Sequence, residues 1–303
     1  MVRFLYFLSL VGLLTFFSCT QPQDTTSEEM KAGISKSQLL AWCIVPYDSQ
    51  DRNPSERISM LKTLGFEQYA YDWRKRHLNT FSQEITEARK ADIDISAVWM
   101  WISPENDAPG ELSADNARLL DIMKENDLQT QLWVGIQDQF FEGLNEEEKT
   151  EKASEMIQYL MDEAKSSVTE LGLYNHGGWF GNPVNQIKLI NNINDERLGI
   201  VYNFHHAHEQ IDNFPQLLDQ MQPYLLAVNL NGMREEGPKI LPIGQGNAEA
   251  DMIKTLLVSG YEGPIGILGH VEEEDVNLVL KRNLQGLDSL VNQFNTTKDD
   301  TNL

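Results

Sequence analysis

The sequence predicts a (β/α)8 barrel, an α/β fold in which eight parallel strands close on themselves. Eight short apolar segments rich in Val, Ile, Trp or Tyr recur with starts roughly 30 residues apart, the size of one strand–helix unit. Helical patterns fill the intervals, and this alternation favours a closed barrel over a doubly wound open sheet. No Gly-rich phosphate loop follows the first segment, so a nucleotide cofactor is not expected. The expected strands are 40–47, 68–72, 95–102, 130–136, 170–176, 199–205, 225–231 and 266–270.

The first expected helix shows clear boundary signals. Asn53 can cap it, Pro54 suits its first position, and Gly65 follows its last apolar residue. Its apolar stripe contains Met60 and Leu61. Further helices are expected at 113–123, 146–165, 185–193, 216–221, 248–258 and 275–291.

The chain divides into four expected parts. Residues 1–18 have the charged start and apolar run of a signal peptide. Residues 19–36 are polar and predict a lipid-anchored flexible tether. Residues 37–293 hold the barrel as one domain, and residues 294–303 predict a disordered polar tail.

Cys19 is the candidate lipidation site. The sequence from Phe16 to Cys19 resembles a bacterial lipobox with Phe16 in place of the usual Leu, although an ordinary signal peptide is the alternative. The apolar run is short for a membrane-spanning helix. We therefore expect a protein of the bacterial cell envelope, held to the membrane by acyl chains on Cys19.

The net charge argues against one class of binding partner, and the cysteine content indicates the role of Cys43. The formal net charge is -22, which repels phosphate backbones and weighs against nucleic acid as a partner. The simpler consequence of this charge is solubility. Once Cys19 is acylated, Cys43 has no partner within the chain, and its apolar surroundings indicate a small core residue instead of a nucleophile.

Polar residues gather where the expected strands end, which is the active-site face of such barrels. Five of the six histidines fall at three of these ends. Successive side chains of a strand face opposite ways, so placing the polar residues inward predicts eight side chains that face the barrel interior. This placement leaves His206 pointing away unless the strand bends there, and it leaves the orientation of His208 open. The inward set is Tyr174, His176, Asn203, His205, Asn229, Asn231, Leu268 and His270, and the outward set is Leu173, Tyr202, Phe204, Val228, Leu230 and Ile267.

Imidazoles in such a cluster have two possible roles. As ligands, they would hold one divalent metal, with Zn, Mn, Ni and Fe as candidates. The candidate ligands are His176, His205, His208 and His270. Without metal, His176 and His205 would serve as general acid and base near neutral pH, with Asp72 as a third catalytic candidate. The residues alone leave both roles open.

A carbohydrate is the expected ligand of this face. Flat aromatic rings beside amides suit the C–H faces and hydroxyls of a sugar, although core packing is the alternative for the tryptophans and is preferred for Trp99 and Trp133. The candidate substrate-binding residues are Trp73, Trp179, Asn203, Asn229, Asn231, Arg234 and Lys239.

Several motifs resemble the sugar isomerase/epimerase superfamily, the xylose-isomerase-like barrels. Residues 173–178 resemble its "LENHGG", residues 204–208 its "FDTGH", and residues 228–231 its "HxKD". Residues 242–247 and 260–267 resemble its loop before the seventh helix and its eighth strand. The resemblance implies the barrel fold and a sugar substrate.

The sequence departs from that family at its metal ligands, which are two Glu, an Asp and a His. Tyr174 stands at the first Glu position and His205 at the Asp position, while His208 keeps the His. The last Glu falls near Leu268 or His270. The two acid/base carboxylates of the epimerases are therefore missing, and either the histidines form an altered metal site or the usual chemistry is lost.

We expect an exported isomerase or epimerase, or a lyase that acts beside a ketone, with an unphosphorylated or oxidised sugar as substrate. Few cations other than Arg74, Arg234 and Lys239 lie at the strand ends, which weighs against a phosphorylated sugar. Members of the superfamily also cleave DNA, but the acidic charge and the anchor weigh against that. A non-catalytic sugar-binding lipoprotein on the same barrel is the alternative.

Overall fold

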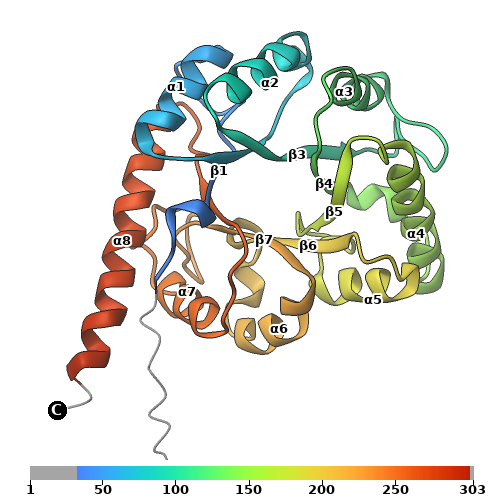
Figure 1. Ribbon diagram of the computed structural model, residues 1–303. Coiled ribbons are helices and arrows are strands. Elements are labelled where there is room, and N and C mark those ends of the chain that lie inside the picture. Colours follow the sequence, from blue (N-terminus) through green and yellow to red (C-terminus); the bar gives the residue numbers. More distant parts are fainter. Residues whose placement is uncertain (1–32, 301–303) are drawn as a thin grey trace, which may run out of the picture. The chain divides into compact units, whose positions relative to one another are not determined.

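Eight parallel strands close into one barrel in sequence order, which confirms the predicted fold (Figure 1). The computed structural model describes residues 33–300, with side chains to residue 296. The helices lie outside the barrel, between successive strands (Figure 1). The strands are β1 Leu39–Trp42, β2 Gln68–Tyr71, β3 Asp94–Ile102, β4 Thr130–Ile136, β5 Val168–Tyr174, β6 Leu198–Asn203, β7 Leu225–Leu230 and β8 Ile265–Leu268.

The helices agree with the sequence patterns except at one place. In α1, the side chain of Asn53 accepts a hydrogen bond from the backbone of Glu56, and Gly65 ends the helix with φ 83°. The helix α2 was not among the expected ones, because its apolar stripe is short and Glu84 lies within the buried face. The helices are α1 Pro54–Leu64, α2 Phe81–Lys90, α3 Ala114–Glu125, α4 Glu146–Glu163, α5 Pro183–Ile193, α6 Phe214–Met221, α7 Glu249–Val258 and α8 Val276–Asp300.

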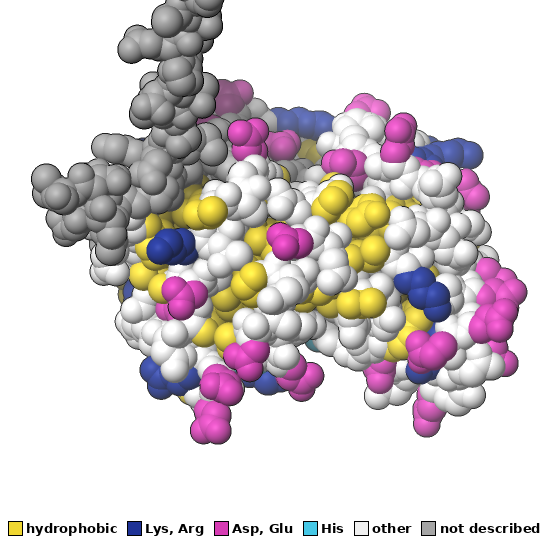
Figure 2. Space-filling view, turned by 90° about the horizontal axis from the view of Figure 1, so that it is seen from below, with side chains coloured by type: hydrophobic (Ala, Val, Ile, Leu, Met, Phe, Trp, Pro, Cys, Tyr) yellow, Lys and Arg dark blue, Asp and Glu magenta, His cyan; other side chains and the backbone are white. Residues whose placement is uncertain are grey.

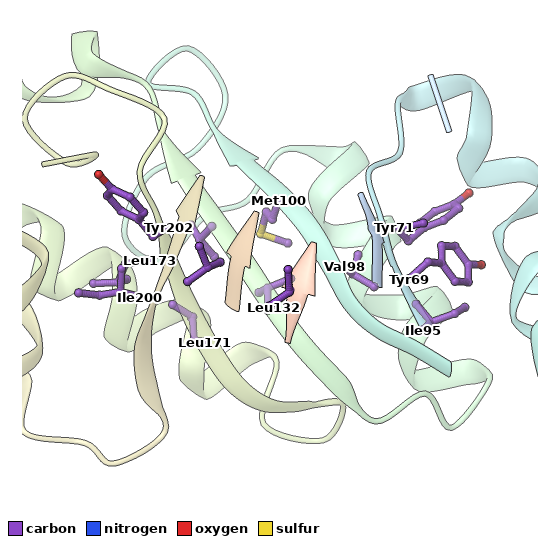
Figure 3. Packing of buried hydrophobic residues seen from close by; sticks show 14 of the residues in the cluster. Tyr69, Tyr71, Ile95, Val98, Met100, Leu132, Leu171, Leu173, Ile200 and Tyr202 are labelled. Atoms are coloured by element: carbon purple, nitrogen blue, oxygen red, sulfur yellow. The ribbon is translucent and has the colours of Figure 1, made fainter. Parts of the chain in front are cut away.

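Strand alternation divides the apolar residues into two layers. One fills the space between strands and helices, where Leu173 and Tyr202 lie (Figure 3). All six residues expected to face outward belong to this layer, as predicted. The second layer fills the barrel itself and includes Trp42, Trp133 and Tyr174. The expected packing role of Trp133 is thus confirmed.

The last helix extends beyond the barrel domain expected from the sequence. The helix α8 continues to Asp300 and so includes residues 294–300, for which the sequence predicts the start of a disordered polar tail. The signal peptide, Cys19 and most of the tether at 19–36 lie outside the described residues. Within residues 33–300, no helix combines the length and apolar character needed to cross a bilayer.

The acidic side chains are spread over the side of the molecule seen in Figure 2. Figure 2 shows Asp and Glu side chains scattered across one side of the molecule, with Lys and Arg between them and apolar side chains in small separate areas. The acidic charge therefore does not form a single patch on this side, which agrees with a role in solubility.

Candidate active site at the barrel mouth

The carboxyl ends of the strands enclose a small cavity of about 80 Å³, hereafter the mouth cavity. Residues from β1, β2, β3, β5, β6 and β8, or from the loops that follow them, line it, so it lies where such barrels place their active sites. It is lined by Trp42, Cys43, Tyr47, Asp72, Arg74, Trp99, Tyr174, His176, Asn203, His205, His206, Leu268 and His270.

Asp72 is the one carboxylate in the lining of the mouth cavity. It directly follows β2, and its Oδ1 accepts hydrogen bonds from the backbone N–H groups of Ile44 (3.1 Å) and Val45 (3.0 Å). Its Oδ2 is buried and has no hydrogen-bond partner. Burial raises the pKa of Asp72 to about 7, despite the two backbone hydrogen bonds that favour its charged form. This carboxyl can therefore both accept and release a proton near neutral pH.

Three histidines line the opposite side of the mouth cavity. The ring of His206 lies 4.3 Å from the rings of both His176 and His205, measured between centroids. His205 in turn lies 5.9 Å from His270. The structure thus brings together His176, His205 and His270, as the sequence predicted, and adds His206.

His206 reaches the mouth because the strand ends before it. The strand β6 stops at Asn203, and a 3-10 turn, η4 (Phe204–His206), follows. The Asn203 side chain accepts a hydrogen bond from the backbone N–H of His205 and holds this turn. The period of two that applies to a strand does not extend into the turn, so His206 faces the mouth, the outcome expected where the strand bends.

Burial makes these imidazoles weak bases. It lowers the pKa of His205 and of His270 to about 4 and that of His206 to about 2. It also lowers the pKa of His176, although that ring stays accessible to solvent. All four are therefore neutral at pH 7, where each ring carries one N–H donor and one acceptor nitrogen.

Aromatic and amide groups form the floor beneath the histidines. The hydroxyl of Tyr174 accepts hydrogen bonds from the indole N–H of Trp42 (3.0 Å) and from the side-chain amide of Asn203. This network engages the hydroxyl of Tyr174, which stands at the position of the family's first Glu, and the side-chain amide of Asn203. Asn203 therefore positions the turn that carries His205 and His206.

A cation and two rings close the remaining side. The rings of Tyr47 and His270 stack with centroids 3.5 Å apart. The guanidinium of Arg74 donates to the Tyr47 hydroxyl at 2.8 Å and lies 5.4 Å above the same ring. Sequence analysis missed Tyr47, although it ends the first apolar segment just as Asp72 ends the second.

A larger cavity of about 670 Å³, hereafter the groove, adjoins the mouth. Arg74, Trp99 and His176 line both. Trp73 lines the groove and donates its indole N–H to the carbonyl of Trp99 at 2.6 Å. The groove continues over the loops that follow β2 and β3 to the first turn of α3.

Three expected substrate-binding residues lie away from the mouth cavity. Trp179 packs against Phe141 at 5.0 Å and donates its indole N–H to Glu146 at the start of α4. Asn229 and Asn231 are fully buried. The amide of Asn231 donates to the carbonyls of Gly232 and Lys239, so it organises the loop after β7.

The expected basic residues and His208 have peripheral positions. Arg234 donates to the carbonyl of Gln245, and neither Arg234 nor Lys239 lines the mouth or the groove. Lys239 is nevertheless near enough to lower the pKa of His176 and His206 by charge repulsion. His208 lies beyond the turn and does not line either cavity.

The side chains present do not fit a resident metal ion. Of the expected ligands, His176, His205 and His270 line the mouth cavity and His208 does not. Between residues 33 and 296, no three His, Cys, Asp or Glu side chains converge as a ligand set. A hydrogen-bonded tyrosine, Tyr174, occupies the position of the family's first Glu. The histidines are thus placed as separate hydrogen-bonding groups.

The chain belongs to the xylose isomerase-like TIM barrel family, whose model matches residues 58–289. No curated protein sequence matches significantly.

Among solved structures, L-ribulose 3-epimerase is similar with a TM-score of 0.65 and 12% identity over 88% of this chain and 98% of its own. The IolI protein with a bound zinc atom has a TM-score of 0.64 and 11% identity over 85% and 99%. The 3-keto-D-glucoside 4-epimerase YcjR from E. coli has a TM-score of 0.60 and 15% identity over 84% and 98%. At these identities the likeness establishes the fold.

Proposed function

We propose that this protein is an exported enzyme of the sugar isomerase/epimerase type, which acts on an unphosphorylated sugar or keto sugar by proton transfer. One observation carries the proposal: a buried carboxyl with a free oxygen and a pKa of about 7 shares a cavity with four neutral imidazoles. The epimerases among the similar structures support the substrate class.

Asp72 carries the proton in this proposal. Its ionised Oδ2 removes the proton from the carbon beside the substrate carbonyl, and the electron pair of that C–H bond moves to the carbonyl oxygen to give an enediolate. Return of the proton to the former carbonyl carbon completes an isomerisation when the hydroxyl proton of the enediolate also passes to its neighbouring oxygen anion. An epimerisation would need a second proton donor, other than Asp72, on the opposite face of the same carbon. Loss of a leaving group one carbon further along would instead make the enzyme a lyase.

The histidines stabilise the charge that develops on oxygen. Neutral imidazole N–H groups can polarise a carbonyl without themselves giving up a proton. His205 and His206 follow one another in the same turn and present two rings to the cavity. Preorganised donors of this kind stabilise an oxyanion strongly in a site that excludes water. The histidines thus assist and Asp72 transfers the proton, which changes the role first expected for His205.

The cations beside the cavity are already engaged, which supports an unphosphorylated substrate. Arg74 donates to Tyr47 and to the carbonyls of Asp72 and Trp73. Lys75 pairs with Asp115 at 3.1 Å. A phosphate would have to break these contacts to gain a cation.

Deuterium exchange tests the proposal whichever product the enzyme forms. The protein is incubated in D2O with D-fructose, D-tagatose, L-ribulose or a 3-keto-D-glucoside, and NMR follows deuterium at the carbon beside the carbonyl. We expect exchange with at least one of these sugars and an Asp72→Asn variant slower by about 10²-fold or more. Asp94→Asn is the control, because Asp94 begins β3 at the other end of the barrel and lines neither cavity. Absence of exchange with every sugar would contradict the proposal.

The non-catalytic sugar-binding alternative is favoured by the missing ligand set of the family, because a binder does not need a metal ion. The same experiment separates the two functions. A binder would show sugar affinity by calorimetry and no exchange above that of the sugar alone in D2O.

The cellular location in this proposal rests on the sequence that ends at Cys19. We expect the mature chain to begin with lipid-modified Cys19 and to fractionate with membranes of the cell envelope. Cys19→Ala should release the protein into the soluble fraction. Retention of that variant in membranes until detergent is added would contradict the lipid anchor.

A further inference from the structure

We infer that the substrate is a glycoside or short oligosaccharide, whose reacting sugar enters the mouth cavity while its second unit lies in the groove against Trp101. The inference rests on the proposed function and specifies its substrate class. Four features of the groove carry it.

The first feature is size. The mouth cavity holds about 80 Å³, well below the range of about 300–1,000 Å³ usual for ligand sites, so it has room for only the reacting end of a sugar. The groove holds about 670 Å³, which lies within this range. Most of the space for a bound molecule is therefore outside the mouth.

The second feature is continuity. Trp99, His176 and Arg74 line both cavities, so a ligand in the groove touches the same rings that surround the reacting end. The rings of His176 and Trp101 lie 4.7 Å apart. A molecule can therefore extend from the mouth into the groove without leaving the protein surface.

The third feature is an aromatic wall. Trp99 and Trp101 stack with an interplanar angle of 25° and centroids 5.9 Å apart. A Cβ atom on Gly135 of β4 would lie 2.6 Å from the ring of Trp101 and 2.7 Å from that of Trp99. The glycine thus creates the space that both indoles occupy. A flat, partly exposed wall of this kind suits the C–H face of a sugar ring.

The fourth feature is that the charged side chains of the groove are paired with one another or hydrogen-bonded. Lys75 and Asp115 form an ion pair, and Asp107 is buried with its carboxylate bonded to Ser103, Ser113 and Asn116. Both cations that line the groove are engaged, because Lys75 pairs with Asp115 and Arg74 donates to backbone carbonyls. The groove therefore suits a neutral unit that carries hydroxyl groups.

Two variants change the groove at residues that do not line the mouth cavity. Trp101→Ala removes the stacking wall. Ala114→Trp fills the groove from the first residue of α3, which is exposed and needs no rearrangement of the core. Tyr224→Ala is the matched control, since it removes a partly exposed aromatic ring that lines neither cavity.

Calorimetry then compares neutral disaccharides built from glucose, galactose, mannose and xylose with their parent monosaccharides. We expect at least one disaccharide to bind about tenfold or more tightly than its monosaccharides, a difference of about 1.4 kcal/mol. Both groove variants should abolish this preference, and Tyr224→Ala should keep it.

Equal affinity for disaccharides and monosaccharides in the unaltered protein would overturn the inference, as would a preference that survives both groove variants. Deuterium exchange on monosaccharides would still stand in either case and would keep the proposed function. A disaccharide preference without exchange on any keto sugar would instead keep the groove assignment and remove the proposed chemistry.

Discussion

Two walls of the mouth cavity respond to the same burial in opposite ways. The acid wall, formed by Asp72 with Arg74 and Tyr47, follows β1 and β2. The histidine wall, formed by His176, His205 and His206, follows β5 and β6. Burial favours the neutral form of every group, so it raises the pKa of a carboxyl and lowers that of an imidazole.

The two walls therefore differ in whether their groups can change protonation state near pH 7. Asp72 reaches a pKa of about 7, where it can take up and release a proton. The pKa values of His205 and His206 move to about 4 and about 2, so both rings remain neutral donors and acceptors. In the proposed mechanism, the histidines that suggest acid/base catalysis in the sequence therefore act as neutral hydrogen-bonding groups, and the carboxylate of Asp72 transfers the proton.

Removal of the histidine wall should have the largest effect. The double variant His205→Asn/His206→Asn loses both rings that face the developing oxyanion, and we expect a rate of deuterium exchange lower by about 10²-fold or more. The pH dependence of the remaining activity should still follow one ionisation near pH 7, since Asp72 is intact. A profile that loses this ionisation would assign the proton transfer to the histidines.

Removal of the acid should stabilise the protein at alkaline pH. The pKa of Asp72 is about 7 in the folded state against 3.8 as a reference, so the folded state keeps a proton that the unfolded chain releases between these values. The free energy of unfolding therefore falls as the pH rises from about 4 to 7 and stays low above that.

Asp72→Asn removes this loss of folding stability. A pKa shift of about three pH units corresponds to up to about 4 kcal/mol at pH 8. Urea unfolding at pH 4 and pH 8 measures it. We expect the variant to gain stability at pH 8 and to differ little from the unaltered protein at pH 4. An equal effect at both pH values would show that Asp72 is not held neutral by burial.

The histidine wall should lower the folding stability as the pH falls, whereas Asp72 lowers it as the pH rises. The pKa of His206 is lowered in the folded state, so the unfolded chain binds a proton first as the pH falls below about 6.5, and folding stability declines. His206→Asn should relieve up to about 2 kcal/mol of this decline at pH 5, from 1.5 pH units below the reference value. Tyr224→Ala, which leaves the mouth unchanged, should decline as the unaltered protein does.

Chelation should have the smallest effect. The histidines do not converge on a common point, so we expect purified protein to carry far less than one divalent ion per chain and to keep its exchange rate in EDTA. Elemental analysis and the same NMR assay check both. One Zn, Mn, Ni or Fe per chain, with exchange lost on its removal, would contradict the side-chain mechanism.

The sequence predicts the barrel well because strand period, helix caps and unit length are local properties. The inward and outward sets of β5 to β8 agree with the structure wherever the residues lie within a strand. Strand alternation does not fix the orientation of side chains just beyond the strands. The turn η4 brings His206 into the mouth, while Gly177 and Gly178, with φ of 90° and 62°, direct the chain so that Trp179 packs near α4.

The pKa of the Asp72 carboxyl tests the proposed difference between the two walls most directly. Protein labelled with ¹³C at the aspartate side-chain carboxyl is titrated by NMR, and the Asp72→Asn spectrum assigns the Asp72 signal. The structure predicts that this signal titrates with a pKa of about 7. A carboxyl that titrates near the reference value of 3.8 would be fully ionised throughout the neutral range. That result would contradict the assignment of Asp72 as the group that both accepts and returns the proton.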